Sequence, residues 1–161
     1  MRKISADYFT YLSDTAGAVE IVEGDARLSM EREEPQEYDL ILLDAFRGDT
    51  IPTHLLTVEA FAVYLKHLAP NGILAVHISN DYLDLRPVVW GAADHLGLTS
   101  ARIRADGDGG LVFWTDYILL SRTGKALRSL AIRSASTGRD MSAPTILWTD
   151  DYSSLFPLFS F

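Results

Sequence analysis

The chain contains no cysteine, and this absence excludes disulfide bonds, thiolate metal sites and cysteine nucleophiles. A cysteine-free chain also fits a reducing compartment, so we expect a cytoplasmic location. No apolar run approaches the ~20 residues that a membrane-spanning helix needs, and the basic start lacks the hydrophobic stretch of a signal peptide. We therefore expect a soluble protein with no membrane partner.

Basic residues are few. Lys and Arg total 14 against 22 Asp and Glu, and the formal charge is −8. Without a basic patch to neutralise phosphates, the composition predicts no nucleic-acid partner. An acidic surface attracts cations, polyamines included, although a net charge of this size is also common for solubility alone.

Metal ligands are equally scarce. Four histidines are scattered without metal-ligand spacing, so we expect no metal site. His67 and His95 are predicted to lie on helix surfaces, and His77, inside an apolar strand, to be a hydrogen-bonded core residue. Asp150 and Asp151 can pair with a cation, but a solvated turn is favoured.

What the chain does have is an ordinary globular composition. Hydrophobic residues make up 48% and charged residues 22% of 161 residues, enough for one domain with a real core. Apolar runs and helix signals alternate along it, which predicts an α/β fold with a parallel sheet and right-handed crossovers. The predicted strands cover residues 19–22, 38–44 and 73–79, and the predicted helices cover residues 26–32, 58–68, 85–96 and 125–132.

Three details sharpen this prediction. The near-continuous apolar run at residues 38–44 is typical of a strand buried on both faces. Thr57 and Asp84 are candidate N-caps for the helices that follow them. Residues 99–104 and 111–121 flank a glycine-rich stretch, which we interpret as the turn of an antiparallel hairpin rather than a phosphate-binding loop, because no helix follows it.

Several motifs together resemble the spermidine synthase-like (polyamine aminopropyltransferase) family. The similarity covers the chain from about Tyr8 onward, and the motifs lie at residues 22–27 (VEGDAR), 38–46 (YDLILLDAF), 54–57 (HLLT), 68–74 (LAPNGIL), 77–85 (HISNDYLDL) and 148–152 (WTDDY). The resemblance implies a Rossmann-like, methyltransferase-type sheet with strand order 3-2-1-4-5-7-6, ending in an antiparallel hairpin. It also implies transfer of an aminopropyl group from decarboxylated S-adenosylmethionine to a polyamine.

The resemblance carries roles onto residues of this chain. Asp25, with Ala26 beside it, corresponds to the adenine-contacting pair, although Asp25 can equally cap the helix at residues 26–32. Asp44 corresponds to the catalytic carboxylate, and its position at the end of a predicted strand is where open α/β sheets bind ligands.

Three further residues are candidates for binding the amine. Asp49 is a candidate substrate ligand, at a spacing that differs from the family's, and a turn residue is the alternative. Asn80 and Tyr82 follow the strand at residues 73–79 and are expected at the same sheet edge as Asp44.

The family's glycine-rich loop and ribose-binding acidic residue would precede residue 1. We therefore expect residues 1–161 to form a single partial domain that lacks the first two strands and is inactive alone. The strand at residues 38–44 should then expose an edge and promote self-association, unless residues 19–22 pair with it or the chain is unstable. An S-adenosylmethionine-dependent methyltransferase and a non-catalytic binding or assembly remnant are the alternative functions.

Overall fold

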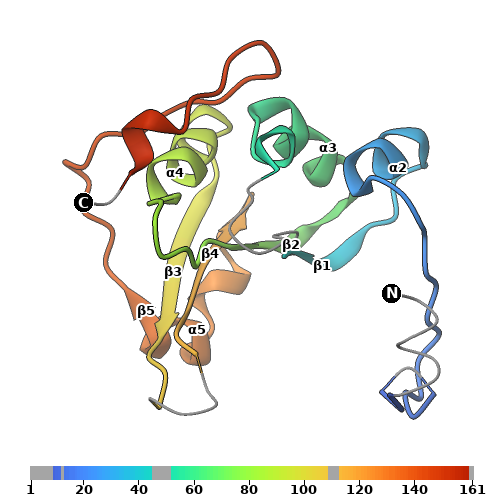
Figure 1. The fold of residues 1–161 in the computed structure, drawn as a ribbon. Helices are drawn as coiled ribbons and strands as arrows, with labels where there is room; N and C mark the ends of the chain where they lie inside the picture. The colour runs from blue at the N-terminus through green and yellow to red at the C-terminus, as the bar shows by residue number, and fades with distance from the viewer. Residues whose placement is uncertain (1–8, 12, 45–51, 109–112, 160–161) are drawn as a thin grey trace.

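The computed structural model describes residues 9–11, 13–44, 52–108 and 113–159. These residues form an open five-stranded sheet, with α3 and α4 on one face and α5 on the opposite side (Figure 1). The elements, in chain order, are α2 (Ala26–Arg32), β1 (Tyr38–Leu43), η1 (Thr53–Leu55), α3 (Val58–His67), β2 (Leu68–His77), α4 (Arg86–His95), β3 (Thr99–Ala105), β4 (Thr115–Ser121), η2 (Ala126–Arg128), α5 (Leu130–Ala135), β5 (Ser136–Thr137) and η3 (Phe156–Leu158).

The sheet order is β1-β2-β4-β3-β5. β1 and β2 are parallel, whereas β4 runs antiparallel to both β2 and β3. The α/β fold class, the parallel pair and the antiparallel hairpin are thus confirmed. The order β1-β2-β4-β3 is also the one that the family resemblance implies for the fourth, fifth, seventh and sixth strands.

Local capping explains where the helices begin. The Asp25 side chain accepts the Leu28 N–H at the start of α2 (2.9 Å), and Thr57 accepts the Ala60 N–H at the start of α3 (3.3 Å). Asp84 also accepts the Arg86 N–H (3.0 Å), but the N-cap of α4 is Leu85, which makes no side-chain capping hydrogen bond. Side-chain acceptors satisfy amides that have no partner within the helix, so capping by Asp25 and Thr57 is confirmed, whereas the N-cap predicted at Asp84 lies one residue later.

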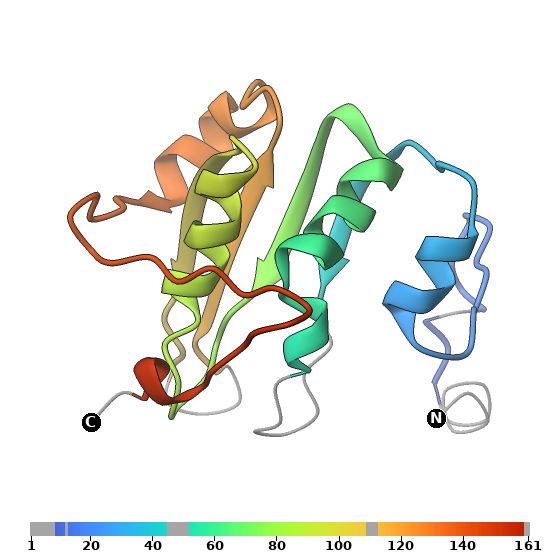
Figure 2. The same cartoon turned by 90° about the horizontal axis from the view of Figure 1, so that it is seen from above.

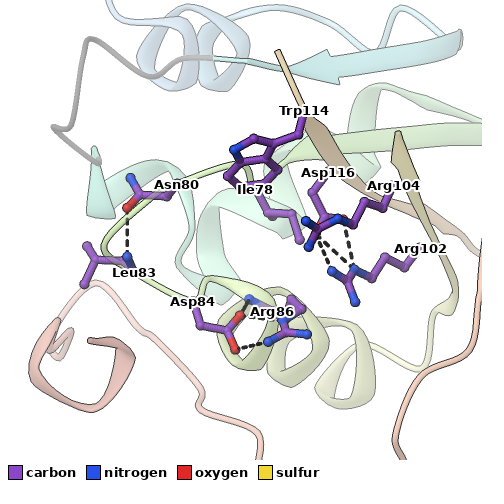
Figure 3. A pocket seen from close by; sticks show the side chains of 9 residues that line it. All are labelled: Ile78, Asn80, Leu83, Asp84, Arg86, Arg102, Arg104, Trp114 and Asp116. Carbon is purple, nitrogen blue, oxygen red and sulfur yellow. Dashed lines mark hydrogen bonds and ion pairs between the residues drawn. The ribbon is translucent and has the colours of Figure 1, made fainter. Parts of the chain in front are cut away.

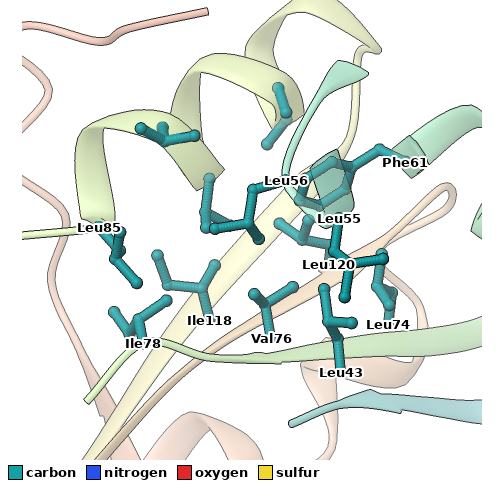
Figure 4. Packing of buried hydrophobic residues seen from close by; sticks show 14 of the residues in the cluster. Leu43, Leu55, Leu56, Phe61, Leu74, Val76, Ile78, Leu85, Ile118 and Leu120 are labelled. Atoms are coloured by element: carbon teal, nitrogen blue, oxygen red, sulfur yellow. The ribbon is translucent and has the colours of Figure 1, made fainter. Parts of the chain in front are cut away.

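The core lies between the sheet and the layer formed by α3 and α4 (Figure 2). Leu43, Val76 and Ile118 project from three neighbouring strands towards this layer, and each is buried (Figure 4). Phe61 of α3 and Leu85, just before α4, pack against them. Burying side chains of this size stabilises the fold by about 1.5–3 kcal/mol each, which makes this layer the main source of stability.

The C-terminal segment crosses the outside of the helical layer (Figure 2). Trp148 is 1% exposed, and its carbonyl accepts the Val58 N–H (2.9 Å). The Ile146 N–H similarly donates to the Pro87 carbonyl (3.0 Å). These bonds fix the segment onto the first turns of α3 and α4.

The expectation that β1 is buried on both faces is wrong. Leu40 is 59% exposed and Leu42 is 56% exposed, while Leu43 is buried. β1 is the edge strand of the described sheet, and α3 covers only the face that carries Leu43. A continuous apolar run predicts two-sided burial only where both faces find a covering layer.

Residues 19–22 do not form the predicted strand. They are irregular, and Val19, Ile21 and Val22 are all exposed. They do not pair with β1, whose ladder partner in the described sheet is β2. A β-prone sequence needs a neighbouring strand to satisfy its backbone groups, and none of the described residues provides one here.

Two further expectations need correction. The helix expected at residues 125–132 is instead the short η2 and α5, separated by Ser129, whose hydroxyl caps α5. His67 is fully buried rather than on the surface, because its Nε2–H donates to the Met30 carbonyl (2.7 Å) beneath α2. Within the described residues, no helix combines the length and apolarity needed to cross a bilayer.

Candidate functional site

Asp44 directly follows β1, at the carboxyl end of the parallel pair. Leu43 of β1 is in register with Val76 of β2. The residues that follow them, Asp44 and His77, therefore lie side by side. His77 Nδ1 lies 2.8 Å from Asp44 Oδ1, and the Asp44 side chain is 47% exposed. The carboxylate is therefore held from one side and open to solvent.

A chain of hydrogen bonds fixes the His77 ring. A carboxylate only accepts hydrogen bonds, so Nδ1 carries a proton towards Asp44. Ser79 Oγ lies 2.7 Å from Nε2 and also accepts the Asp116 N–H (2.7 Å). When the second ring nitrogen, Nε2, carries no proton, it accepts a hydrogen bond from the Ser79 hydroxyl, and the hydrogen bonds then run from the Asp116 N–H through Ser79 and His77 to Asp44.

Tyr117 supports the same ring from one side. The rings of His77 and Tyr117 stack with centroids 4.8 Å apart and planes 24° apart. Burial raises the pKa of the Tyr117 hydroxyl, and the nearby Asp44 charge raises it further. The prediction of a hydrogen-bonded histidine is confirmed, but His77 lies at the rim of the sheet, with a side chain that is 19% exposed.

Asp25 uses both carboxylate oxygens locally. Oδ1 caps α2 through Leu28, and Oδ2 lies 2.8 Å from His54 Nε2. The Leu28 amide, followed by His54, lowers the pKa of the Asp25 carboxyl. The capping role is confirmed, and Ala26 is the exposed first residue of the helix.

Arg27, on the same helix, ties α2 to the C-terminal turn. Its Nη1 and Nη2 donate to the two carboxylate oxygens of Asp150 (2.7 and 2.6 Å). Nη1 also donates to the His54 carbonyl (2.9 Å), and Thr57 Oγ1 donates to Asp150 (2.7 Å). Asp150 is therefore not the solvated turn residue that we expected, because it forms an ion pair with Arg27, 123 positions away in sequence. This ion pair fixes α2, the helix that Asp25 caps.

Of the three residues proposed to bind the amine, Asn80 lines a cavity, whereas Tyr82 does not. Asn80 Oδ1 accepts the N–H groups of Tyr82 (2.9 Å) and Leu83 (2.8 Å), and Asn80 lines a cavity of about 130 Å³. The Tyr82 side chain is 59% exposed and is not part of that cavity's lining. Asp49 lies outside the described residues. Among the residues that are described, no group of three or more His, Asp or Glu is arranged to hold a metal ion.

The fold and one segment of the sequence are similar to those of known proteins. No protein-family profile matches the chain. The polyamine aminopropyltransferase of Vibrio vulnificus (strain CMCP6) is 43% identical over 56 residues. A probable spermidine synthase from Corynebacterium glutamicum ATCC 13032 superposes with a TM-score of 0.64 at 22% identity, and the spermidine synthase from Thermotoga maritima with 0.56 at 12%. The chain thus shares the fold of these two solved proteins, and one segment of it is similar in sequence to an aminopropyltransferase.

The extent of the similarity differs between these relatives. The aligned segment spans 34% of this chain and 19% of the Vibrio protein. The superpositions cover 96% and 92% of this chain but only 61% and 50% of the two solved chains. The chain therefore spans only part of the length of each protein that it matches.

Sequence reasoning missed the partners that hold the candidate residues. His54, Arg27 and Asp116 were not assigned any role. One signal was available, because His77 and Ser79 are two positions apart at a strand end, so their side chains share a face. No comparable local signal connects Arg27 with Asp150.

Proposed function

We propose that this spermidine synthase-like chain is an aminopropyltransferase domain, which transfers the aminopropyl group of decarboxylated S-adenosylmethionine to a polyamine. The observation that carries the proposal is Asp44, a solvent-open carboxylate fixed by His77 at the carboxyl end of a parallel strand pair. Ligands bind at this edge in open α/β sheets. The sequence similarity to an aminopropyltransferase supports this chemistry over others that the fold can carry.

The transfer makes simple demands on the site. A neutral amine nitrogen attacks the methylene carbon attached to the sulfonium; the N–C bond forms, and the C–S bond breaks with its electron pair going to sulfur. The nitrogen must then lose a proton. Asp44 is proposed to orient the amine and to accept that proton, because a positioned carboxylate can do both. Asp49, Asn80 and Tyr82 remain proposed contacts for the rest of the amine.

His77 and Ser79 are proposed to act through Asp44. The order Asp44, His77, Ser79 is that of a hydrolase triad. However, the aspartate of a hydrolase triad is buried behind its histidine, whereas the Asp44 side chain is 47% exposed, and Ser79 Oγ also accepts the Asp116 N–H. We therefore propose that Ser79 fixes the imidazole, which orients Asp44, and that Ser79 is not a nucleophile.

Asp25 and Ala26 are proposed to bind the adenine. An adenine amino group would compete with His54 for Asp25 Oδ2 while the helix cap on Oδ1 stays in place. Residues 1–24 contain only two glycines, Gly17 and Gly24, so the chain does not supply the glycine-rich loop that the family resemblance implies. We accordingly propose that adenosyl ligands bind weakly and that the chain alone does not turn over.

Isothermal titration calorimetry tests the proposal. Decarboxylated S-adenosylmethionine, S-adenosylmethionine and methylthioadenosine are titrated into the full chain, with and without putrescine. We expect the decarboxylated compound to bind more tightly than S-adenosylmethionine. D25N should lower the affinity for all three ligands. If putrescine changes the affinity for the decarboxylated compound, D44N should remove that change in affinity. D39N, at the opposite end of β1, is the matched control and should change neither result.

The same titrations separate the alternative functions. Preference for S-adenosylmethionine would favour the methyltransferase. No heat with any adenosyl compound would favour a non-catalytic binding or assembly role. Turnover of putrescine by the chain alone would contradict the proposed inactivity but not the assignment of the chemistry.

A further inference from the structure

A second polar site lies beside β3 and β4, on the sheet face that α4 covers. It is the cavity of about 130 Å³ already noted for Asn80 (Figure 3). Arg86 comes from the start of α4, and Arg102 and Arg104 come from β3. Trp114 and Asp116 project from the region of β4. Three of the chain's 14 basic residues therefore gather in one cavity of a protein whose net charge is −8.

Two of the three arginines have strong partners within the cavity wall. Arg102 binds Asp116 through Nε and Nη2, and both side chains are largely buried, at 13% and 6% exposure. Arg86 binds both oxygens of Asp84 (2.7 Å each), and these hydrogen bonds lower the pKa of the Asp84 carboxyl despite its partial burial. These two guanidinium groups are neutralised where they stand.

Arg104 is held differently. Its guanidinium lies over the Trp114 ring, 5.2 Å from the centroid. Its ion pair with Asp106 is long, at 3.4 Å, and Asp106 is 87% exposed. Such a surface pair contributes little and is readily exchanged. The aromatic face thus positions a planar cation at the cavity, and within the described part of the chain the ion pair of this guanidinium is the long one with Asp106.

We propose that this cavity binds the carboxylate group of a small organic acid, with Arg104 as the bidentate donor and Trp114 packing against the ligand's body. The planar guanidinium matches a carboxylate geometrically. The residues that line the cavity carry three guanidinium groups and two carboxylates, so one positive charge remains for a ligand carboxylate that takes the place of the exposed Asp106 at Arg104. A phosphate dianion would leave surplus negative charge beside Asp84 and Asp116, and a diamine would meet three arginines.

NMR of the full chain, with no adenosyl compound present, tests this site separately from the transferase proposal. The Trp114 indole N–H is assigned by comparison with W114F. Sodium propionate, sodium benzoate, sodium phosphate and putrescine dihydrochloride are titrated at constant ionic strength. We expect a saturable shift of the Trp114 signal with both carboxylates. R104Q should weaken their binding about tenfold or more, since charge-assisted hydrogen bonds are lost.

The controls distinguish the carboxylate site from general charge effects. R133Q removes an exposed arginine on α5 and should leave binding unchanged, whereas R104K keeps the charge but loses the fork and should be intermediate. The spectra themselves show whether each variant is folded. Tighter binding of phosphate or putrescine than of either carboxylate would overturn the proposal. An unchanged affinity in folded R104Q, or the absence of a saturable carboxylate shift, would do the same.

Discussion

Replacing Arg27 by methionine tests whether the clamp between α2 and the C-terminal turn stabilises the fold. The Arg27 side chain is 12% exposed and donates to Asp150, to Glu31 and to the His54 carbonyl. Methionine keeps most of the aliphatic stem and removes only these donors. Asp150 would retain its hydrogen bond from Thr57.

The magnitude follows from the exposure of the partners. A hydrogen bond to a charged group contributes about 1.5–3 kcal/mol net, but such terms do not add within one network. Water can resolvate Asp150 after the change, because its side chain is 44% exposed. We therefore expect R27M to lower the free energy of unfolding by about 2–3 kcal/mol, and D150N by about 1–2 kcal/mol.

Urea unfolding followed by circular dichroism measures both variants and the double mutant. If the ion pair couples the two residues, the double mutant should lose about 1–2 kcal/mol less than the sum of the single changes. R133M on the exposed face of α5 is the matched control and should change the stability little. Strict additivity, or a loss in R27M no larger than in R133M, would refute the reasoning.

The same pair predicts a pH dependence. The Arg27 hydrogen bonds lower the pKa of the Asp150 carboxyl from 3.8 to about 2 in the folded chain. A group whose pKa is depressed by folding stabilises the native state above its unfolded value and loses that contribution as the carboxylate protonates. The difference in stability between wild type and D150N should be full at neutral pH and shrink as the pH falls from 3.8 towards 2. A constant difference across that range would contradict the assignment.

Two further changes test the packing and the exposed edge. G91A should lower the free energy of unfolding by about 3 kcal/mol in urea titrations, because a Cβ would overlap the Ile146 carbonyl, whereas G138A meets open space and should be neutral. A near-neutral G91A would contradict the close approach of the C-terminal segment to α4. L42K places a charge on the exposed face of the edge strand and should reduce self-association measured by size-exclusion chromatography with light scattering, while L130K, on a side chain 83% exposed, should not. A wild-type chain that is already a stable monomer would remove the basis of this last prediction.

The helices and strands nearest the site were largely predictable because local interactions define them. Thr57 begins α3 through its own side chain, and the hairpin of β3 and β4 follows from two strand-like runs around a turn. The position of Asp44 at the carboxyl end of a strand could be predicted because an apolar run ends there. The exposure of Leu42 could not be predicted, since it depends on which faces of the sheet other segments cover.

By itself the sequence determined the α/β class, the capping residues and the family resemblance, all of which depend on neighbours along the chain or on short motifs. Only the tertiary structure decided what surrounds the candidate residues. It set His77 against Asp44, Arg27 against Asp150 and Arg104 over Trp114. Such contacts arise where crossovers and strand register bring distant side chains within hydrogen-bonding range, and nothing in the local sequence records that register.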